Sequence, residues 1–144
     1  MNRTAARLVL GASVAGPALC QLAVRYWGRR GTALVACVCT GLAARDLAMV
    51  ADGVPSRLCR GPATLLYLEL LAALAAAGLN WRAVLHGAEV ARGLSGPDTG
   101  ARGAAPDPFE VARRGAVAAL FGLHTARFAI YLRPDQGRAL PGRG

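Results

Sequence analysis

Five ionisable side chains stand inside stretches of sequence that are otherwise apolar. They are Arg45, Asp46, Glu69, His124 and Arg127. Carboxylates and an imidazole can take up and pass on a proton, whereas arginines are permanent cations that bind anions or neutralise carboxylates. Ionisable groups in apolar surroundings often mark proton relays, ligand pockets or catalytic acids. These five residues are therefore the first candidates for chemistry.

If the apolar runs are helices with a rise of about 1.5 Å per residue, the candidate residues lie at similar depths from the same end of the helices. Asp46 lies about 6 Å from the end of its apolar run, and Glu69 about 10.5 Å from the start of the next. His124 and Arg127 lie about 12 and 7.5 Å from the end of the last run. Ser13 lies about 7.5 Å into the first run. If successive helices alternate in direction, all these groups form one layer, in the half that faces both termini.

Two interpretations of this layer stay open. In the first, ion pairs and hydrogen bonds hold the helices in register. The charges of the two arginines and the two carboxylates sum to zero, with His124 neutral, so each buried charge can have a partner. In the second, the layer is a site in which Glu69, the deepest acid, carries a proton. The predicted catalytic residues are then Asp46, Glu69 and His124, and the predicted binding residues are Ser13, Arg45 and Arg127.

The segments that position these residues are four apolar runs separated by arginine-bearing segments. The chain of 144 residues is 54% apolar and 17% charged, with a mean hydropathy of +0.36. Each run is about long enough to cross a bilayer as a helix, which takes about 17 to 25 residues. We therefore predict an all-α integral membrane four-helix bundle in the cell membrane, forming a single domain over 1–144. The predicted helices span about 8–24, 32–50, 62–81 and 108–132.

Two alternatives to this architecture remain. The runs are rich in Ala and Gly, which contribute little transfer free energy, so a soluble Ala-rich bundle is possible. The first run could also be a signal peptide, but Leu19 stands before Cys20 where a lipoprotein cleavage site requires a small residue. We expect the first helix to be retained.

The flanks of the runs favour the four-helix division. Tyr26, Trp27 and Trp81 fall at one face in an alternating topology, and amphipathic aromatic residues favour that level of a membrane. The segment 82–107 is predicted to be a polar loop, although its first part, 81–94, could extend the third helix or lie along the interface. Asp107 is the expected N-cap of the last helix.

Small residues at four-residue spacing suggest where helices approach closely. Gly11 with Ala15 and Ala12 with Gly16 occur in the first run, and the third run has similar alanine pairs at 72 and 76 and at 73 and 77. Such spacing allows helix backbones to come close together in lipid.

Charge and motifs exclude several functions. The net charge is +9, but all 17 basic residues are arginines in short segments between apolar runs, not along one groove with aromatic residues. We expect no nucleic-acid partner. No phosphate-binding loop, His-Glu-x-x-His or nucleophile elbow is present, and the two histidines lie on different segments. We therefore expect no metal and no cofactor. The arginines divide almost equally between the two faces, so orientation in the membrane is weakly specified.

Three short segments carry a family resemblance. "RLVLGA" (7–12), "VRYWGRR" (24–30) and "AARDLAMV" (43–50) resemble uncharacterised small four-helix membrane proteins of actinobacteria, a group similar to the DoxX-like family. The resemblance covers about the first third of the chain. It implies the four-helix membrane fold and a family role for Arg45 and Asp46, but no activity.

These observations lead to a general expectation of function. We expect a multi-pass membrane protein that acts as an accessory or assembly protein, with the lipid bilayer and either further copies of itself or another membrane protein as partners. The alternatives are a membrane-embedded acid-base enzyme acting on a lipophilic substrate, such as an isomerase or cyclase, and a small proton-coupled transporter.

Overall fold

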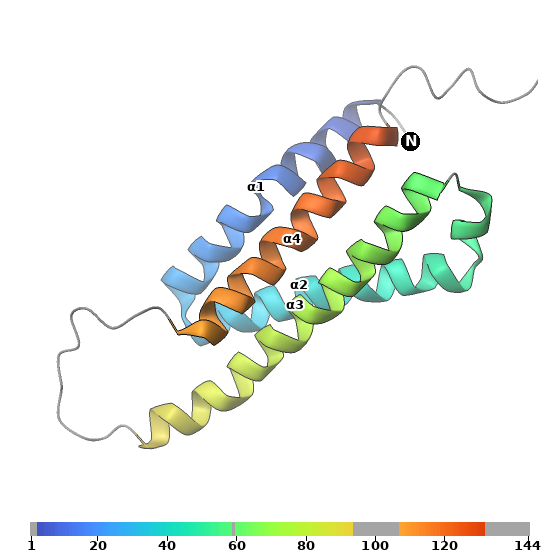
Figure 1. The fold of residues 1–144 in the computed structure, drawn as a ribbon. Coiled ribbons are helices and arrows are strands. Elements are labelled where there is room, and N and C mark those ends of the chain that lie inside the picture. The colour runs from blue at the N-terminus through green and yellow to red at the C-terminus, as the bar shows by residue number, and fades with distance from the viewer. Residues whose placement is uncertain (1–2, 59, 94–106, 132–144) are drawn as a thin grey trace, which may run out of the picture.

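The fold is an all-α four-helix bundle. A computed structural model describes residues 3–58, 60–93 and 107–131. The helices in these ranges are α1 (Arg3–Trp27), α2 (Arg29–Ala51), α3 (Arg60–Gly93) and α4 (Pro108–Tyr131), with a short 3-10 helix, η1 (Val54–Arg57), between α2 and α3. Figure 1 shows the start of α1 beside the end of α4. We call this the η1 end of the bundle and the opposite one the Gly28 end.

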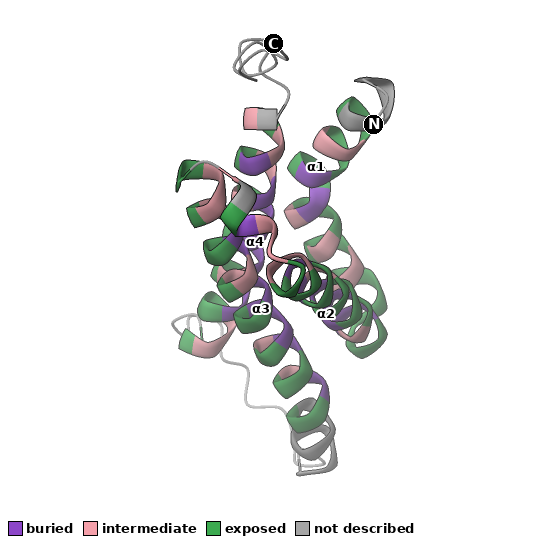
Figure 2. Cartoon of the chain, turned by 90° about the vertical axis from the view of Figure 1, so that its right-hand side faces the viewer, coloured by how far each residue is buried: buried purple, intermediate pink, exposed green. Residues whose placement is uncertain are grey.

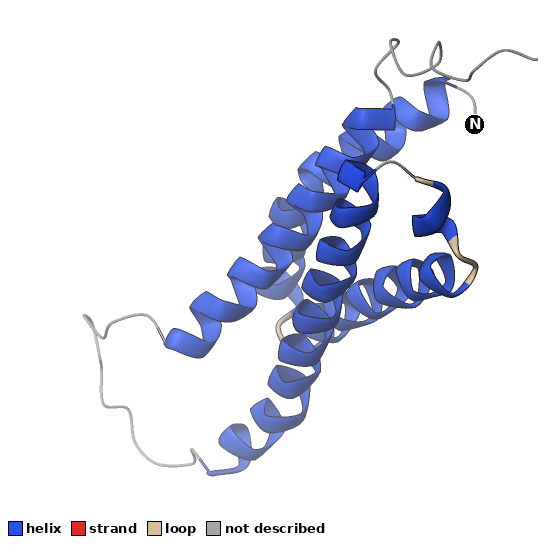
Figure 3. Ribbon diagram, turned by 45° about the vertical axis from the view of Figure 1, so that its right-hand side comes forward, coloured by secondary structure: helices blue, strands red, loops and turns tan. Residues whose placement is uncertain are grey.

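The four helices form a closed ring of neighbours. α3 packs against α2 and α4, and α1 packs against the same two helices. Figures 1 and 3 show that α2 runs at a clear angle to the other three helices. The turn between α1 and α2 has a single linking residue, Gly28, whose φ of 51° is a left-handed conformation that favours glycine.

The four helices cover the predicted segments, but α1 extends from Arg3 to Trp27 and is longer than the predicted 8–24, and the predicted loop differs more. Asp107 caps α4 as expected, because its Oδ1 accepts a hydrogen bond of 3.0 Å from the backbone N–H of Phe109. However, α3 continues to Gly93, so the expected loop over 82–107 is wrong for its first half and the helical extension is right. Residues 82–93 contain no proline, and the spacing of their apolar residues continues that of α3.

Each of α2, α3 and α4 buries a stripe of residues three or four positions apart. The middle of the stripe is apolar, with small residues such as Cys39 and Ala73 beside the larger Leu120, and polar residues lie toward its ends. Small residues in the middle let the helices approach closely. The bundle therefore has an apolar centre between two polar layers.

Burial in this bundle differs in two ways from that in an ordinary soluble protein. The largest fully buried side chains include Arg127, Glu69, Asn80 and Asp46. By contrast, many leucines point outward; Leu71, for example, is 63% exposed. Figure 2 shows exposed residues along the outer surfaces of all four helices. Water disfavours a continuous surface of this kind, whereas lipid favours it.

Three helices in the described part of the chain are long and apolar enough to cross a membrane. These segments are Arg7–Trp27, Arg29–Ala51 and Arg60–His86. The sequence predicted four, and α4 is not among those that qualify by composition. Polar residues lower its hydropathy, yet Arg113, His124 and Arg127 in α4 are buried in the bundle and do not face outward.

Candidate functional site

Side chains from α2, α3 and α4 meet in the half of the bundle toward the η1 end. This Glu69 cluster consists of Asp46, Glu69, His124 and Arg127, each at most 5% exposed. Nδ1 of His124 is in direct contact with Oε1 of Glu69. The four residues predicted to lie at one depth therefore contact one another in the structure.

Arg127 is the centre of the Glu69 cluster because it contacts both carboxylates. Its NH2 group donates to Asp46 Oδ1 at 3.2 Å and to Glu69 Oε1 at 3.3 Å. Its Nε lies 2.8 Å from Glu69 Oε2, close enough for an ion pair, although the angle at these atoms is not that of a hydrogen bond. Arg127 NH1 and Asp46 Oδ2 have no hydrogen-bond partner within the described residues. Four side-chain atoms of the cluster thus form no hydrogen bond within the described residues: Arg127 Nε and NH1, Glu69 Oε2 and Asp46 Oδ2.

The other two predicted site residues lie outside this cluster. Arg45 approaches Asp46 with its NH2 group 3.5 Å from Oδ1, but its side chain is 40% exposed. Ser13 is buried on α1, where its hydroxyl donates to the backbone oxygen of Val9 at 2.8 Å. Its hydrogen bond is therefore satisfied within its own helix, and the structure gives it no bond to the cluster.

Helical spacing explains how the cluster is positioned. His124 and Arg127 are three residues apart on α4 and so share one face, which also carries Leu120. Glu69 lies one turn from Leu66 and one turn from Ala73 on the buried stripe of α3. The ring of His124 also packs against Phe128, with 4.8 Å between ring centroids, which limits its rotation. The imidazole is thus held facing Glu69.

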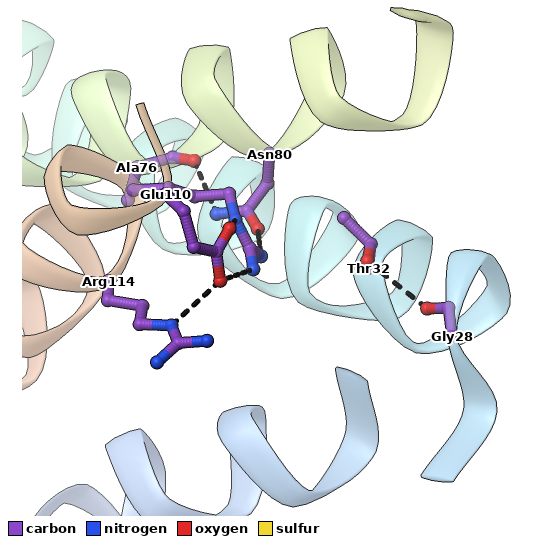
Figure 4. A network of polar contacts seen from close by, with 7 residues as sticks. Gly28, Thr32, Ala76, Asn80, Glu110 and Arg114 are labelled. Atoms are coloured by element: carbon purple, nitrogen blue, oxygen red, sulfur yellow. Dashed lines mark hydrogen bonds and ion pairs between the residues drawn. The ribbon is translucent and has the colours of Figure 1, made fainter. Parts of the chain in front are cut away.

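A second polar group, toward the Gly28 end, was not predicted from the sequence, and its buried members are Asn80 and Arg113. This Arg113 network consists of Asn80, Glu110, Arg113 and Arg114, and Figure 4 shows its contacts. Arg113 NH1 donates to Asn80 Oδ1 at 2.9 Å, and Asn80 Nδ2 donates to the backbone oxygen of Ala76 at 2.8 Å. Periodicity contains the signal: Asn80 lies about three turns from Glu69, and Arg113 about four turns from Arg127, on the same stripes.

Glu110 joins the two arginines of this network. It accepts from Arg113 Nε at 2.8 Å and NH2 at 2.7 Å, and from Arg114 Nε at 2.7 Å. Hydrogen bonds from Arg113, and then those from Arg114, lower the pKa of Glu110 below its ordinary value. The stabilisation this carboxylate provides is thus present above its ordinary pKa and is lost as the pH falls through the lowered pKa.

A cavity of about 340 Å³ opens beside the Arg113 network and not at the Glu69 cluster. Residues of α1, α2 and α4 line it, and they combine an apolar wall with three arginines. The lining residues are Pro17, Cys20, Gln21, Val24, Arg25, Val35, Glu110, Arg113, Arg114 and Val117.

The described residues contain no group of three or more His, Cys, Asp or Glu side chains arranged to hold a metal ion. In the Glu69 cluster the guanidinium of Arg127 contacts both carboxylates, at the position where a cation would bind. The chemistry that this arrangement can support is proton transfer between Glu69 and His124, or static charge pairing.

Comparison with known proteins does not add a family. No protein-family model, curated protein or solved structure gave a significant match to the chain. The resemblance to DoxX-like proteins therefore stays a prediction.

Proposed function

We propose that the protein is a multi-pass protein of the cell membrane in which all four helices, α4 included, cross the bilayer. The outward-facing leucines and the inward-facing charges support this location over a soluble Ala-rich bundle. A charged α4 can cross because its Arg127 and His124 contact partners inside the bundle and do not meet lipid.

Within the membrane, we propose an accessory or assembly role in which the Glu69 cluster fixes the arrangement of the helices. The observation that carries this proposal is that Arg127 of α4 contacts carboxylates from two other helices, α2 and α3. An unpaired ion in lipid costs several kcal/mol, so a shifted helix would lose these pairs at a high cost. The bundle so fixed would present its outer apolar faces to a membrane protein partner or to further copies of itself.

A double-mutant cycle tests this role. We expect Glu69→Leu and Arg127→Met each to lower the free energy of unfolding in detergent by about 3 kcal/mol, because each leaves a buried charge without its partner. The double variant should recover much of that loss, since it also removes the desolvation cost of both ions. The coupling is read from thermal unfolding of the wild type, both single variants and the double variant. A coupling energy near zero would remove the basis of the proposal.

The Glu69–His124 contact favours a second candidate function, an acid-base site. Nδ1 of His124 contacts Oε1 of Glu69, so an imidazole and a carboxyl group are placed for proton transfer between them. The site would then serve a membrane-embedded isomerase or cyclase, or a proton-coupled transporter.

The isosteric variant Glu69→Gln separates the two candidates. If the cluster is structural, this variant should be clearly less heat-stable than the wild type. If Glu69 carries a proton, the variant should stay stable while proton uptake into proteoliposomes, followed with a pH-sensitive dye, is lost. Wild-type proteoliposomes that take up no protons would remove the transporter from consideration.

A further inference from the structure

The cavity beside the Arg113 network has the chemistry of an anion site with an apolar wall. Its charged lining residues are Arg25, Arg113, Arg114 and Glu110, so its formal charge is +2. The remaining lining residues are mostly apolar, among them Val24 and Val117. A small inorganic ion would need only the cations, whereas an amphiphilic anion would use both parts.

Glu110 offsets one of the three positive charges, and both of its oxygens are engaged by the arginines. Oε1 accepts from Arg113 and Arg114, and Oε2 accepts from Arg113. Glu110 thus orients the two guanidinium groups. Figure 4 shows the two terminal nitrogens of Arg114 pointing away from Glu110.

Donor counting identifies the groups left for a ligand. A guanidinium has five N–H donors. Arg113 uses three of its nitrogens on Glu110 and Asn80, whereas Arg114 uses only Nε. Arg25 is exposed and forms no ion pair within the part of the chain that the structure describes. Arg25 on α1 and Arg114 on α4, which both line the cavity, therefore have free N–H donors.

We propose that this cavity binds a phosphate group, clamped between Arg25 and Arg114, with Arg113 as a fixed positive charge behind them. Arginine matches phosphate oxygens with paired N–H donors, which makes phosphate the favoured anion. The phosphate could belong to a lipid headgroup or be free. The apolar wall and the exposed Tyr26 and Trp27 next to Arg25 favour the lipid, because aromatic residues gather at headgroup level. Only the lipid source rests on the proposed membrane location.

Native mass spectrometry of the detergent-solubilised full chain tests the proposal. The probes are phosphatidylglycerol, inorganic phosphate and diacylglycerol, which has the same tails without phosphate. We expect phosphatidylglycerol to bind the wild type, and Arg25→Gln and Arg114→Gln each to weaken it about tenfold through loss of a charge-assisted contact. Arg30→Gln is the matched control, because Arg30 is exposed near the same end but does not line the cavity.

The outcomes separate the site from its alternatives. Competition by inorganic phosphate at similar concentrations would support the site with free phosphate as its source. Binding of phosphatidylglycerol without such competition would support the lipid source. Equal binding of diacylglycerol, equal loss in Arg30→Gln, or no phosphate binding at all would overturn the proposal. Arginine-dependent phosphate binding by a chain that carbonate releases from membranes would uphold the site while rejecting the membrane location.

Discussion

Arg45 and Asp46 are adjacent in the sequence but lie in different environments. Asp46 is fully buried and pairs with Arg127, whereas Arg45 is 40% exposed and approaches the same carboxylate at 3.5 Å. Successive residues on a helix point about 100° apart, so only one of the two can face the bundle. The long side chain of Arg45 can reach outward while its stem stays in the apolar layer.

This difference gives a prediction for single residues. Asp46→Asn should lower the free energy of unfolding by about 3 kcal/mol, because it removes a buried counter-charge of Arg127. Arg45→Gln should lower it by less than about 1 kcal/mol, because an exposed ion pair contributes little. Thermal unfolding of both variants in one detergent measures the contrast. Equal losses would mean that Arg45 belongs to the buried cluster.

At the scale of the helices, small residues act only where they face a neighbour. On α3, Ala73, Ala76 and Ala77 are buried in the core, as the four-residue spacing suggested. On α1, Gly16 lies against the Phe121 ring of α4, so closely that an added Cβ would overlap it. Gly11, by contrast, has open space around its Cα. The same spacing on α1 therefore includes positions that do not pack inside the bundle.

Glycine substitutions test the contact between α1 and α4. Gly16→Ala should lower the free energy of unfolding by about 1 to 3 kcal/mol, because Phe121 is buried and the site would be overpacked. Gly11→Ala is the control, and it should be neutral or stabilise the protein by up to about 1 kcal/mol through helix propensity. The variant Phe121→Leu, added to Gly16→Ala, should restore part of the loss. Equal unfolding temperatures for the two alanine variants would contradict close packing at Gly16.

At the scale of the whole molecule, the two polar layers are about 16 Å apart along α3, counted from Glu69 to Asn80. The Glu69 cluster lies toward the η1 end, and the Arg113 network and the cavity lie toward the Gly28 end. Arg82 of α3 over the Phe109 ring of α4, 5.1 Å from its centroid, belongs to the second end as well. In a membrane, the protein would thus place the ion pairs of the Glu69 cluster in one half of the bilayer and a layer of basic and aromatic residues near the opposite face.

Topology mapping tests whether all four helices span. Reporters fused to the two termini should lie on one side, and a reporter inserted between residues 94 and 106 on the other, because four crossings alternate. The nearly equal division of arginines should allow both orientations, and two or three added arginines on one face should select one. A C-terminal reporter on the same side as the inserted one would show that α4 does not cross.

Helix periodicity and length determined the helical class, the four helices and the four residues of the Glu69 cluster. A helix advances by a fixed rise per residue, so the depths of Asp46, Glu69, His124 and Arg127 could be counted without coordinates. The N-cap at Asp107 could also be predicted from the sequence, because the cap involves only residues within one helical turn.

Tertiary structure alone decided which side of each helix faces the bundle. Because of these orientations, the Ser13 hydroxyl bonds within its own helix and the Arg45 side chain is partly exposed. The same orientations bring Asn80 of α3 and Arg113 of α4 into hydrogen-bond contact. It also produced the cavity between α1, α2 and α4. Rotation of a helix about its axis depends on packing against its neighbours, and in an alanine-rich chain several rotations look alike in the sequence.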